Sequence, residues 1–135
     1  MTFVLDASVA VSWCFADEAS ARSLHVRSML EEQRAVVPPL WTYELANALA
    51  VAVRRNRLSV ETAAEMIDRF GDLPIDISEV PRAASELLRV AREHEVTAYD
   101  AAYLHLAMSR GVPLATFDER LATASRAAGV PVIDG

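Results

Sequence analysis

Short runs of apolar residues alternate along the chain with longer stretches in which apolar positions recur every three or four residues. The short runs predict buried strands, since uninterrupted apolar runs are typical of strands that are covered on both faces. These runs are Thr2–Leu5, Ala35–Val37, Ile75–Ile77, Val112–Thr116 and Val130–Ile133. Their regular alternation with helical stretches predicts a mostly parallel sheet with helices on both faces.

The longer stretches have the periodicity of amphipathic helices. They cover about residues 7–15, 17–32, 40–55, 59–70, 81–94, 97–110 and 118–128. Gly71, Gly111 and Gly129 follow three of them, at positions where glycine commonly ends a helix. Pro81 fits the first turn of another. The chain shows no linker, repeat or low-complexity segment, so we expect one α/β domain that spans residues 1–135.

The composition is that of a globular protein with a substantial core, because 53% of the 135 residues are hydrophobic. No apolar run approaches the roughly 18 to 20 residues that a membrane helix needs. The N-terminal residues also lack the features of a signal peptide, so we expect a cytoplasmic protein that does not associate with membranes. Cys14 is the single cysteine, which excludes a disulfide framework and a thiolate metal cluster.

All positive charges come from arginine, and the sequence contains no lysine. This absence argues against phosphoacceptor signalling domains and haloacid-dehalogenase-type phosphatases, since both need a lysine at a late strand end. The glycines are too few and too scattered for a nucleotide-binding turn. The formal net charge is −6. The arginines at 54, 55 and 57 and at 82, 89 and 92 are either local phosphate contacts or solvated helix ends.

Four acidic residues occupy positions where a carboxylate is unfavourable unless something compensates it. Asp6 and Asp118 each directly follow an apolar run. Glu44 interrupts an apolar helical stretch, and Asp100 lies near the start of another. If the fold brings these acids together, only a bound cation makes their shared negative charge tolerable. Oxygen ligands of this kind predict Mg²⁺ or Mn²⁺ rather than structural zinc.

Each acid also has a purely structural interpretation. Asp6 and Asp118 can cap the helices that follow them, and Asp100 can form a capping box with Thr97. Glu44 is harder to explain in this way, because a carboxylate on an apolar helix must be exposed, paired or bound to a metal. The functional hypothesis therefore rests on the coincidence of all four acids.

Further polar residues are candidates for supporting roles. Ser8 and Thr116 each lie two residues from an acid at a strand end, where a hydroxyl can orient a metal-binding carboxylate or a water molecule. Both are equally compatible with plain cap or strand roles. Asn47 lies three residues after Glu44, on the same face of the helix.

The aromatic residues near these acids allow two roles. Trp41 and Tyr103 are expected to pack in the core. Tyr43 is a candidate for stacking on nucleic-acid bases.

The motifs around the acids resemble those of PIN-domain ribonucleases, and most closely those of the VapC toxins of bacterial and archaeal toxin–antitoxin pairs. The matching segments are Val4–Ser8, Pro39–Asn47, Tyr99–Tyr103 and Ala115–Asp118. They occur in the order found in the family, and the resemblance covers essentially the whole chain. One such motif alone would be a weak signal, whereas the ordered set is specific.

The resemblance implies a PIN-like three-layer α/β/α sandwich with a central, mostly parallel sheet of four or five strands. It implies that the acidic quartet of the family corresponds to Asp6, Glu44, Asp100 and Asp118. It also implies supporting roles for Ser8, Asn47 and Thr116, which match polar positions that are common in the family.

The resemblance further implies a Mg²⁺- or Mn²⁺-dependent endoribonuclease that cuts tRNA, rRNA or mRNA. Family members typically form homodimers and are inhibited by a small VapB-type antitoxin. Two alternatives stay open at this point. One is a solitary PIN nuclease that acts in RNA maturation without an antitoxin, and the other is a PIN-like module that binds RNA or protein without cutting.

Overall fold

The computed structural model describes residues 1–134. Its strands are β1 (Thr2–Leu5), β2 (Arg34–Val37), β3 (Ile75–Ile77) and β4 (Leu114–Ala115). Its helices are α1 (Ala7–Ser12), α2 (Ala21–Met29), α3 (Leu40–Arg54), α4 (Val60–Gly71), α5 (Ala84–His94), α6 (Ala98–Arg110) and α7 (Glu119–Ala127). The predicted alternation of strands and helices is confirmed.

The strands form one parallel sheet in the order β3-β2-β1-β4. Phe3 of β1 pairs with Ala35 of β2, and Leu5 of β1 pairs with Ala115 of β4. The chain moves outward from β1 to β3 and then returns to the other side of β1 to form β4. This reversal creates a switch point between β1 and β4, and ligand sites form at the carboxyl ends of strands at such points.

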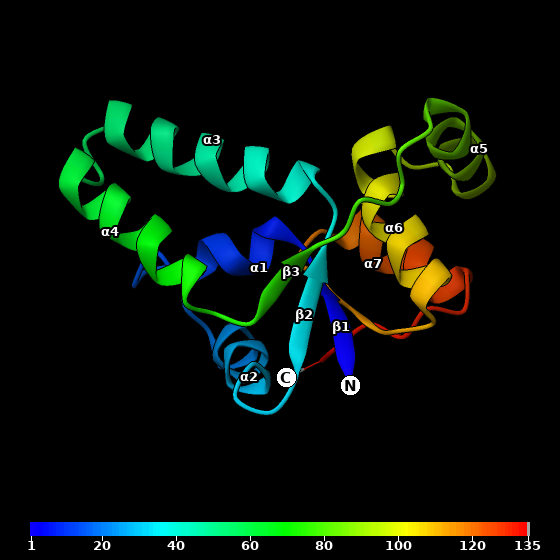
Figure 1. The fold of residues 1–135 in the computed structure, drawn as a ribbon, viewed down its shortest axis with the longest axis horizontal. Helices are drawn as coiled ribbons and strands as arrows, with labels where there is room; N and C mark the ends of the chain where they lie inside the picture. Colours follow the sequence, from blue (N-terminus) through cyan, green and yellow to red (C-terminus); the bar gives the residue numbers. More distant parts are fainter. Residues whose placement is uncertain (135) are drawn as a thin grey trace.

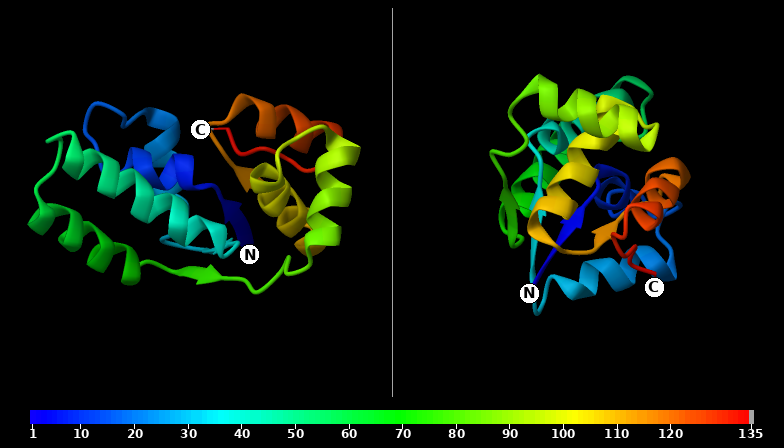
Figure 2. Two further views of the ribbon diagram at one scale, coloured as in Figure 1. Left: turned by 90° about the horizontal axis from the view of Figure 1, so that it is seen from above. Right: turned by 90° about the vertical axis from the view of Figure 1, so that its right-hand side faces the viewer.

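Helices cover both faces of the sheet, as Figure 1 shows. On one side α1 packs against α2 and α3, and α3 packs against α4. On the other side α6 contacts α5, α7, β1 and β4, and the left view of Figure 2 shows the same separation from above. The predicted three-layer α/β/α sandwich is therefore confirmed. Among the helices of residues 1–134, none is both long enough and apolar enough to cross a lipid bilayer.

The core forms where the apolar strands meet the helices. Phe3, Val4 and Leu5 are fully buried, as expected for a central strand that is covered on both faces. Tyr103 and Leu104 of α6 are also buried and lie on the helix that packs against β1. This close packing fixes the end of β1, and with it the position of the residue that follows.

Several helix boundaries differ from the prediction. α2 begins at Ala21 rather than near Asp17, because Asp17 lies in a preceding turn and pairs with Arg57. α5 begins at Ala84, so the prediction that Pro81 lies in its first turn is wrong. A proline is as compatible with an extended segment as with a first helical turn, so the sequence could not decide between them. α1 also ends earlier than predicted.

The strand predicted at Val130–Ile133 is reduced to a single bridge between Val132 and Leu114. Leu114 N–H donates to the carbonyl of Pro131, and Ile133 N–H donates to the carbonyl of Leu114, both over 2.9 Å. Pro131 has no N–H, and β4 itself is only two residues long, so the ladder does not continue. Within the described residues the sheet has four strands.

Candidate active site

A groove at the carboxyl ends of β1 and β4 brings the predicted acids together. Asp6 directly follows β1, and Asp118 directly precedes α7. Glu44 lies on α3 and Asp100 on α6, on opposite sides of the sheet. The groove encloses about 450 Å³. It is lined by Asp6, Ala7, Ser8, Val11, Glu18, Glu44, Asp100, Phe117 and Asp118.

Asp6 is buried, and two hydroxyl groups hold it. Ser8 Oγ donates to Asp6 Oδ2 over 2.8 Å, and Thr116 Oγ1 donates to the same oxygen over 2.6 Å. Asp6 occupies the N-cap position of α1, yet its side chain makes no capping hydrogen bond. The capping interpretation is therefore wrong for Asp6. Its carboxylate is oriented by the two hydroxyls instead.

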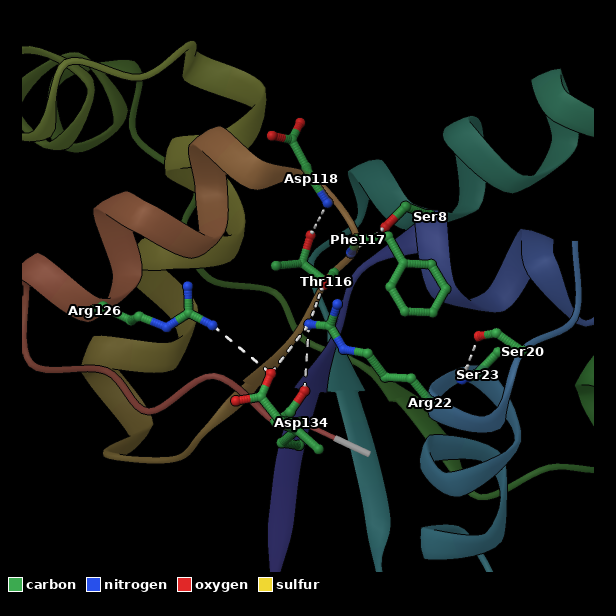
Figure 3. Close-up of polar contacts among 10 residues, drawn as sticks. Ser8, Ser20, Arg22, Ser23, Thr116, Phe117, Asp118, Arg126 and Asp134 are labelled. Atoms are coloured by element: carbon green, nitrogen blue, oxygen red, sulfur yellow. Dashed lines mark hydrogen bonds and ion pairs between the residues drawn. The ribbon is translucent and has the colours of Figure 1, made fainter.

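The same two hydroxyls also hold the backbone that follows β4. Phe117 N–H donates to Ser8 Oγ over 3.1 Å. Asp118 N–H donates to Thr116 Oγ1 over 3.0 Å, a contact drawn in Figure 3. Each hydroxyl thus accepts a hydrogen bond from this backbone and donates one to Asp6. Together they tie the end of β1 to the end of β4 across the switch point.

Glu44 is half-buried, and its partner comes from α6. The Tyr103 hydroxyl donates to Glu44 Oε1 over 2.6 Å and accepts from Ala7 N–H over 3.3 Å. The prediction that Tyr103 lies in the core is confirmed, whereas its contact with Glu44 was not predicted. The available signal was the hydroxyl itself, because a buried tyrosine usually needs a hydrogen-bond partner. Burial raises the pKa of Tyr103, so its hydroxyl stays protonated and acts as a donor.

Asp118 and Asp100 both lie at helix N-termini. Asp118 Oδ1 accepts from Arg120 N–H over 2.9 Å and from Leu121 N–H over 3.2 Å, so it caps α7 while it lines the groove. Asp100 N–H donates to Thr97 Oγ1 over 3.1 Å, which makes Thr97 the cap of α6. The positive end of a helix dipole stabilises a nearby negative charge, so both carboxylates have local support.

Burial dominates the electrostatics of the groove, and repulsion between the carboxylates adds to its effect. Burial raises the pKa of Asp6, against the opposing effect of its hydroxyl hydrogen bonds. Burial also raises the pKa of Glu44, and the charges on Asp6 and Asp100 add to this rise. Burial together with the Asp118 and Asp6 carboxylates raises the pKa of Asp100 to about 6. The hydrogen bonds and helix N-termini of the groove therefore offset the negative charge of these acids only in part.

The chemistry of the groove fits a hard divalent cation. Its lining residues offer carboxylate and hydroxyl oxygens and include no His, Cys or basic side chain. Oxygen ligands of this kind suit Mg²⁺ and Mn²⁺, and a cation would offset the charge that raises the pKa values. Within residues 1–134, no three acidic, His or Cys side chains are already clustered tightly enough to enclose an ion. The acids thus line the groove without closing around a common point.

Two residues differ from the predicted set of site residues. Asn47 is exposed on α3 and does not line the groove. Glu18 does line it, and Arg57 Nη1 donates to Glu18 Oε2 over 3.2 Å. Because Arg57 also pairs with Asp17, this arginine is engaged with neighbouring acids rather than free to contact a phosphate.

Comparison with known proteins identifies the family. The family model described as PIN domain matches residues 3–127. The chain belongs to the PIN-domain family. Ribonuclease VapC1 of Mycobacterium tuberculosis is 35% identical over 123 residues, which are 90% of this chain and 89% of that protein. The resemblance to VapC-type PIN ribonucleases is confirmed.

Solved structures share the fold of this PIN domain. A protein from Pyrobaculum aerophilum has a TM-score of 0.76 at 25% identity, and the match covers 98% of this chain and 89% of that one. VapBC2 from Rickettsia felis, which was solved bound to a DNA fragment from the promoter, has a TM-score of 0.70 at 12% identity. That match covers 98% of each chain and concerns the fold alone.

Proposed function

We propose that this PIN domain is a metal-dependent endoribonuclease of the VapC type, which hydrolyses phosphodiester bonds in RNA. The proposal rests on one observation, the convergence of the acidic quartet on one groove at the switch point of the sheet. The quartet consists of Asp6, Glu44, Asp100 and Asp118. The relationship to a protein named Ribonuclease VapC1 supports this activity.

The acidic quartet would hold Mg²⁺ or Mn²⁺. When bound, such an ion supplies Lewis-acid stabilisation of the phosphodiester and lowers the pKa of water at the site. The protein contributes the orientation of its carboxylates. Ser8 and Thr116 fix Asp6, and Tyr103 holds Glu44 in a hydrogen bond that favours its ionised form. Restraints of this kind commonly set the affinity and activity of a metal site.

Two exposed aromatic side chains support RNA as the substrate. Tyr43 and Tyr99 are 74% and 66% exposed, and they directly precede Glu44 and Asp100 in the sequence. Exposed aromatic rings stack on unpaired bases, at about 1 to 3 kcal/mol per base. We therefore expect the substrate to be an unpaired segment of a tRNA, rRNA or mRNA.

A VapB-type antitoxin and a second copy of the chain complete the proposal, with the cytoplasm as the place of action. The similarity in fold to VapBC2 supports an antitoxin partner. Val60 and Ile67 of α4 leave apolar surface exposed beside α3. Contiguous apolar surface of this kind is typical of protein–protein contacts.

Cleavage of RNA in the presence of Mn²⁺ tests the proposed activity directly. We expect Asp6→Asn to nearly abolish cleavage and to leave the fold intact, because it removes a charge but almost no volume. Arg34→Gln is the matched control, since Arg34 forms an exposed ion pair with Asp76 outside the groove, and this variant should cleave like the wild type. Activity retained by Asp6→Asn, purified free of wild-type enzyme, would refute the assigned role. Circular dichroism checks the fold.

Two further observations separate the alternatives. If the wild-type protein binds RNA but never cuts it with Mg²⁺ or Mn²⁺ present, the non-catalytic module is the better description. A short reading frame next to the gene favours the toxin over a solitary nuclease of RNA maturation. Mapping the 5′ ends of total RNA after brief induction of the protein would then identify the target.

A further inference from the structure

Arg22 joins three segments that are far apart in the sequence (Figure 3). It lies in the first turn of α2, which Ser20 caps by accepting Ser23 N–H over 3.0 Å. Its Nη2 donates to the carbonyl of Thr116 over 3.0 Å and to the carbonyl of Ile133 over 3.4 Å. The same atom lies 3.7 Å from Asp134 Oδ1. One guanidinium group thus connects α2, the end of β4 and the C-terminal segment.

The residue that Arg22 holds is central to the candidate site. Thr116 is buried, and its hydroxyl donates to Asp6 while it accepts from Asp118 N–H. Its carbonyl receives the Arg22 hydrogen bond, so Thr116 is restrained from both sides. Any displacement of its backbone would move the hydroxyl that orients Asp6.

Arg22 also supports the next residue of the same segment. Its guanidinium carbon lies 5.1 Å from the centre of the Phe117 ring, in a cation–π contact. Phe117 lines the groove. Both hydrogen bonds and the ion pair of Arg22 come from Nη2. The planar guanidinium group can lie near the ring at the same time, whereas the ammonium of a lysine acts as a compact point charge. The arrangement therefore depends on the shape of the arginine as well as on its charge.

From these contacts we infer that Arg22 is a positioning residue of the candidate active site. It holds the Thr116 carbonyl and the Phe117 ring, and thereby sets the orientation of Asp6 and of the backbone at Asp118. This inference rests on the proposed function, because the groove is an active site only if the protein is a nuclease. It adds a basic residue on α2 to a site whose groove is lined by acidic, small and apolar residues.

A purely structural role is the alternative, because Arg22 also contacts Ile133 and Asp134. The chain offers matched controls for this role. Arg126 Nη2 lies 3.7 Å from the same Asp134 oxygen and anchors the C-terminal segment from α7. Arg126→Met and Asp134→Asn therefore weaken this anchor and leave the hydrogen bond from Arg22 to Thr116 in place.

The test compares Arg22→Met and Arg22→Lys with these two controls. Three kinds of measurement are made: the Mn²⁺ dissociation constant by calorimetry, kcat and KM on an unpaired RNA oligonucleotide, and the amide NMR signals of the metal-free protein.

We expect Arg22→Met to weaken Mn²⁺ binding and lower kcat by about 10- to 100-fold, with KM changed less than twofold. The amide signals of Phe117 and Asp118 should shift. Arg22→Lys should be intermediate, and both controls should stay within twofold of the wild type.

The possible outcomes separate the inference from the proposed function. If Arg22→Met lowers the melting temperature but keeps the wild-type Mn²⁺ affinity, kcat and amide signals, the role is structural and the inference fails. Equal losses in Arg126→Met and Asp134→Asn would also overturn it, since the anchor would then be the cause. If Arg22→Met does not fold, Arg22→Lys decides by the same criteria. A wild-type protein that neither binds Mn²⁺ nor cuts RNA refutes the proposed function. Even then, the amide signals of Phe117 and Asp118 in metal-free Arg22→Met test whether Arg22 positions this segment.

Discussion

Hydroxyl groups on individual residues restrain the acids of the groove. Ser8 and Thr116 converge on one oxygen of Asp6, and Tyr103 binds one oxygen of Glu44. These bonds lower the free energy of the ionised carboxylates, whereas burial raises it. Removing a single hydroxyl therefore changes the charge state of the site as well as its geometry.

Tyr103→Phe isolates one of these hydroxyl groups, because the ring stays in place. The hydrogen bond from Tyr103 lowers the pKa of Glu44, so its loss should raise that pKa. We expect the acidic limb of the pH–rate profile to move to higher pH and kcat to fall by about 10- to 100-fold. The unpaired amide of Ala7 should lower the free energy of unfolding by about 1 to 3 kcal/mol.

Tyr99→Phe is the control for this variant, since Tyr99 lies one turn earlier on α6 and is exposed. It removes the same hydroxyl from a position outside the contact with Glu44. A Tyr103→Phe enzyme with the pH–rate profile of Tyr99→Phe would contradict the assigned contact.

Asp100 gives the metal-free protein a distinctive dependence on pH. Its pKa is raised to about 6 in the folded protein and is about 3.9 in an unfolded chain. The folded state therefore binds the proton more tightly. Ionised Asp100 opposes folding at neutral pH, and this penalty decreases as the pH falls through about 6 and is gone below about 4. We expect metal-free Asp100→Asn to be more stable than the wild type at pH 7.5, with a smaller difference at pH 5.

Melting temperatures measured at a series of pH values test this expectation. Asp76→Asn is the control, because Arg34 lowers the pKa of Asp76 in the folded protein. Ionised Asp76 therefore favours folding, and this variant should be less stable than the wild type at both pH values. An Asp100→Asn difference that does not change between pH 5 and pH 7.5 would be inconsistent with the raised pKa.

Among the elements, the N-termini of α6 and α7 each place one acid at the groove. α7 begins at the residue after Asp118, so the same carboxylate both caps the helix and faces the other acids. A helix N-terminus stabilises such a charge. The two roles of Asp118 can be separated, because capping needs only a short polar side chain, whereas cation binding needs the charge.

Asp118→Asn and Asp118→Ala distinguish capping from catalysis. Asparagine caps about as well as aspartate, whereas alanine costs about 1 kcal/mol. We expect both variants to lose RNA cleavage, and only Asp118→Ala to lose stability in chemical denaturation. Ser59→Ala removes the cap of α4, far from the groove, and should lose similar stability with full activity. Wild-type cleavage by Asp118→Asn would show that the cap is the only role of Asp118.

For the whole molecule, the order of the strands decides that the acids meet. The return of the chain to β4 places Asp118 beside Asp6, and the helices of opposite layers bring Glu44 and Asp100 to the same groove. Such a concentration of carboxylates makes the metal-free fold less stable than it would be with a cation bound. Binding of an ion to the folded state alone then stabilises it.

Mn²⁺ should therefore raise the melting temperature of the wild-type protein, and a chelator should reverse the effect. At a concentration about 100 times the dissociation constant, the expected gain is about 2.7 kcal/mol. Asp100→Ala should gain much less, because one of the proposed ligands is missing. If millimolar Mn²⁺ leaves the wild-type melting temperature unchanged, the proposed metal site does not exist. The alternative of a non-catalytic module is then favoured.

The sequence by itself determined the elements and the residues to examine. Apolar runs such as Thr2–Leu5 marked the strands, because a strand that is covered on both faces has few polar positions. The order of the acidic motifs indicated the PIN family, and the absence of lysine argued against two other classes of protein. The strand and helix signals are local, so they can be read from neighbouring residues, whereas the motif order is read along the whole chain.

Only the tertiary structure decided how these parts meet. Periodicity does not determine strand order, and so the placement of β4 beside β1 was not predictable from it. The contacts of Tyr103 with Glu44 and of Arg22 with Thr116 span 59 and 94 residues, and no local pattern encodes them. The tertiary structure also distinguished Asp6 from Asp118. By sequence both can cap a helix, but only the side chain of Asp118 does so. Packing selects one of several locally acceptable partners, and that choice depends on the whole fold.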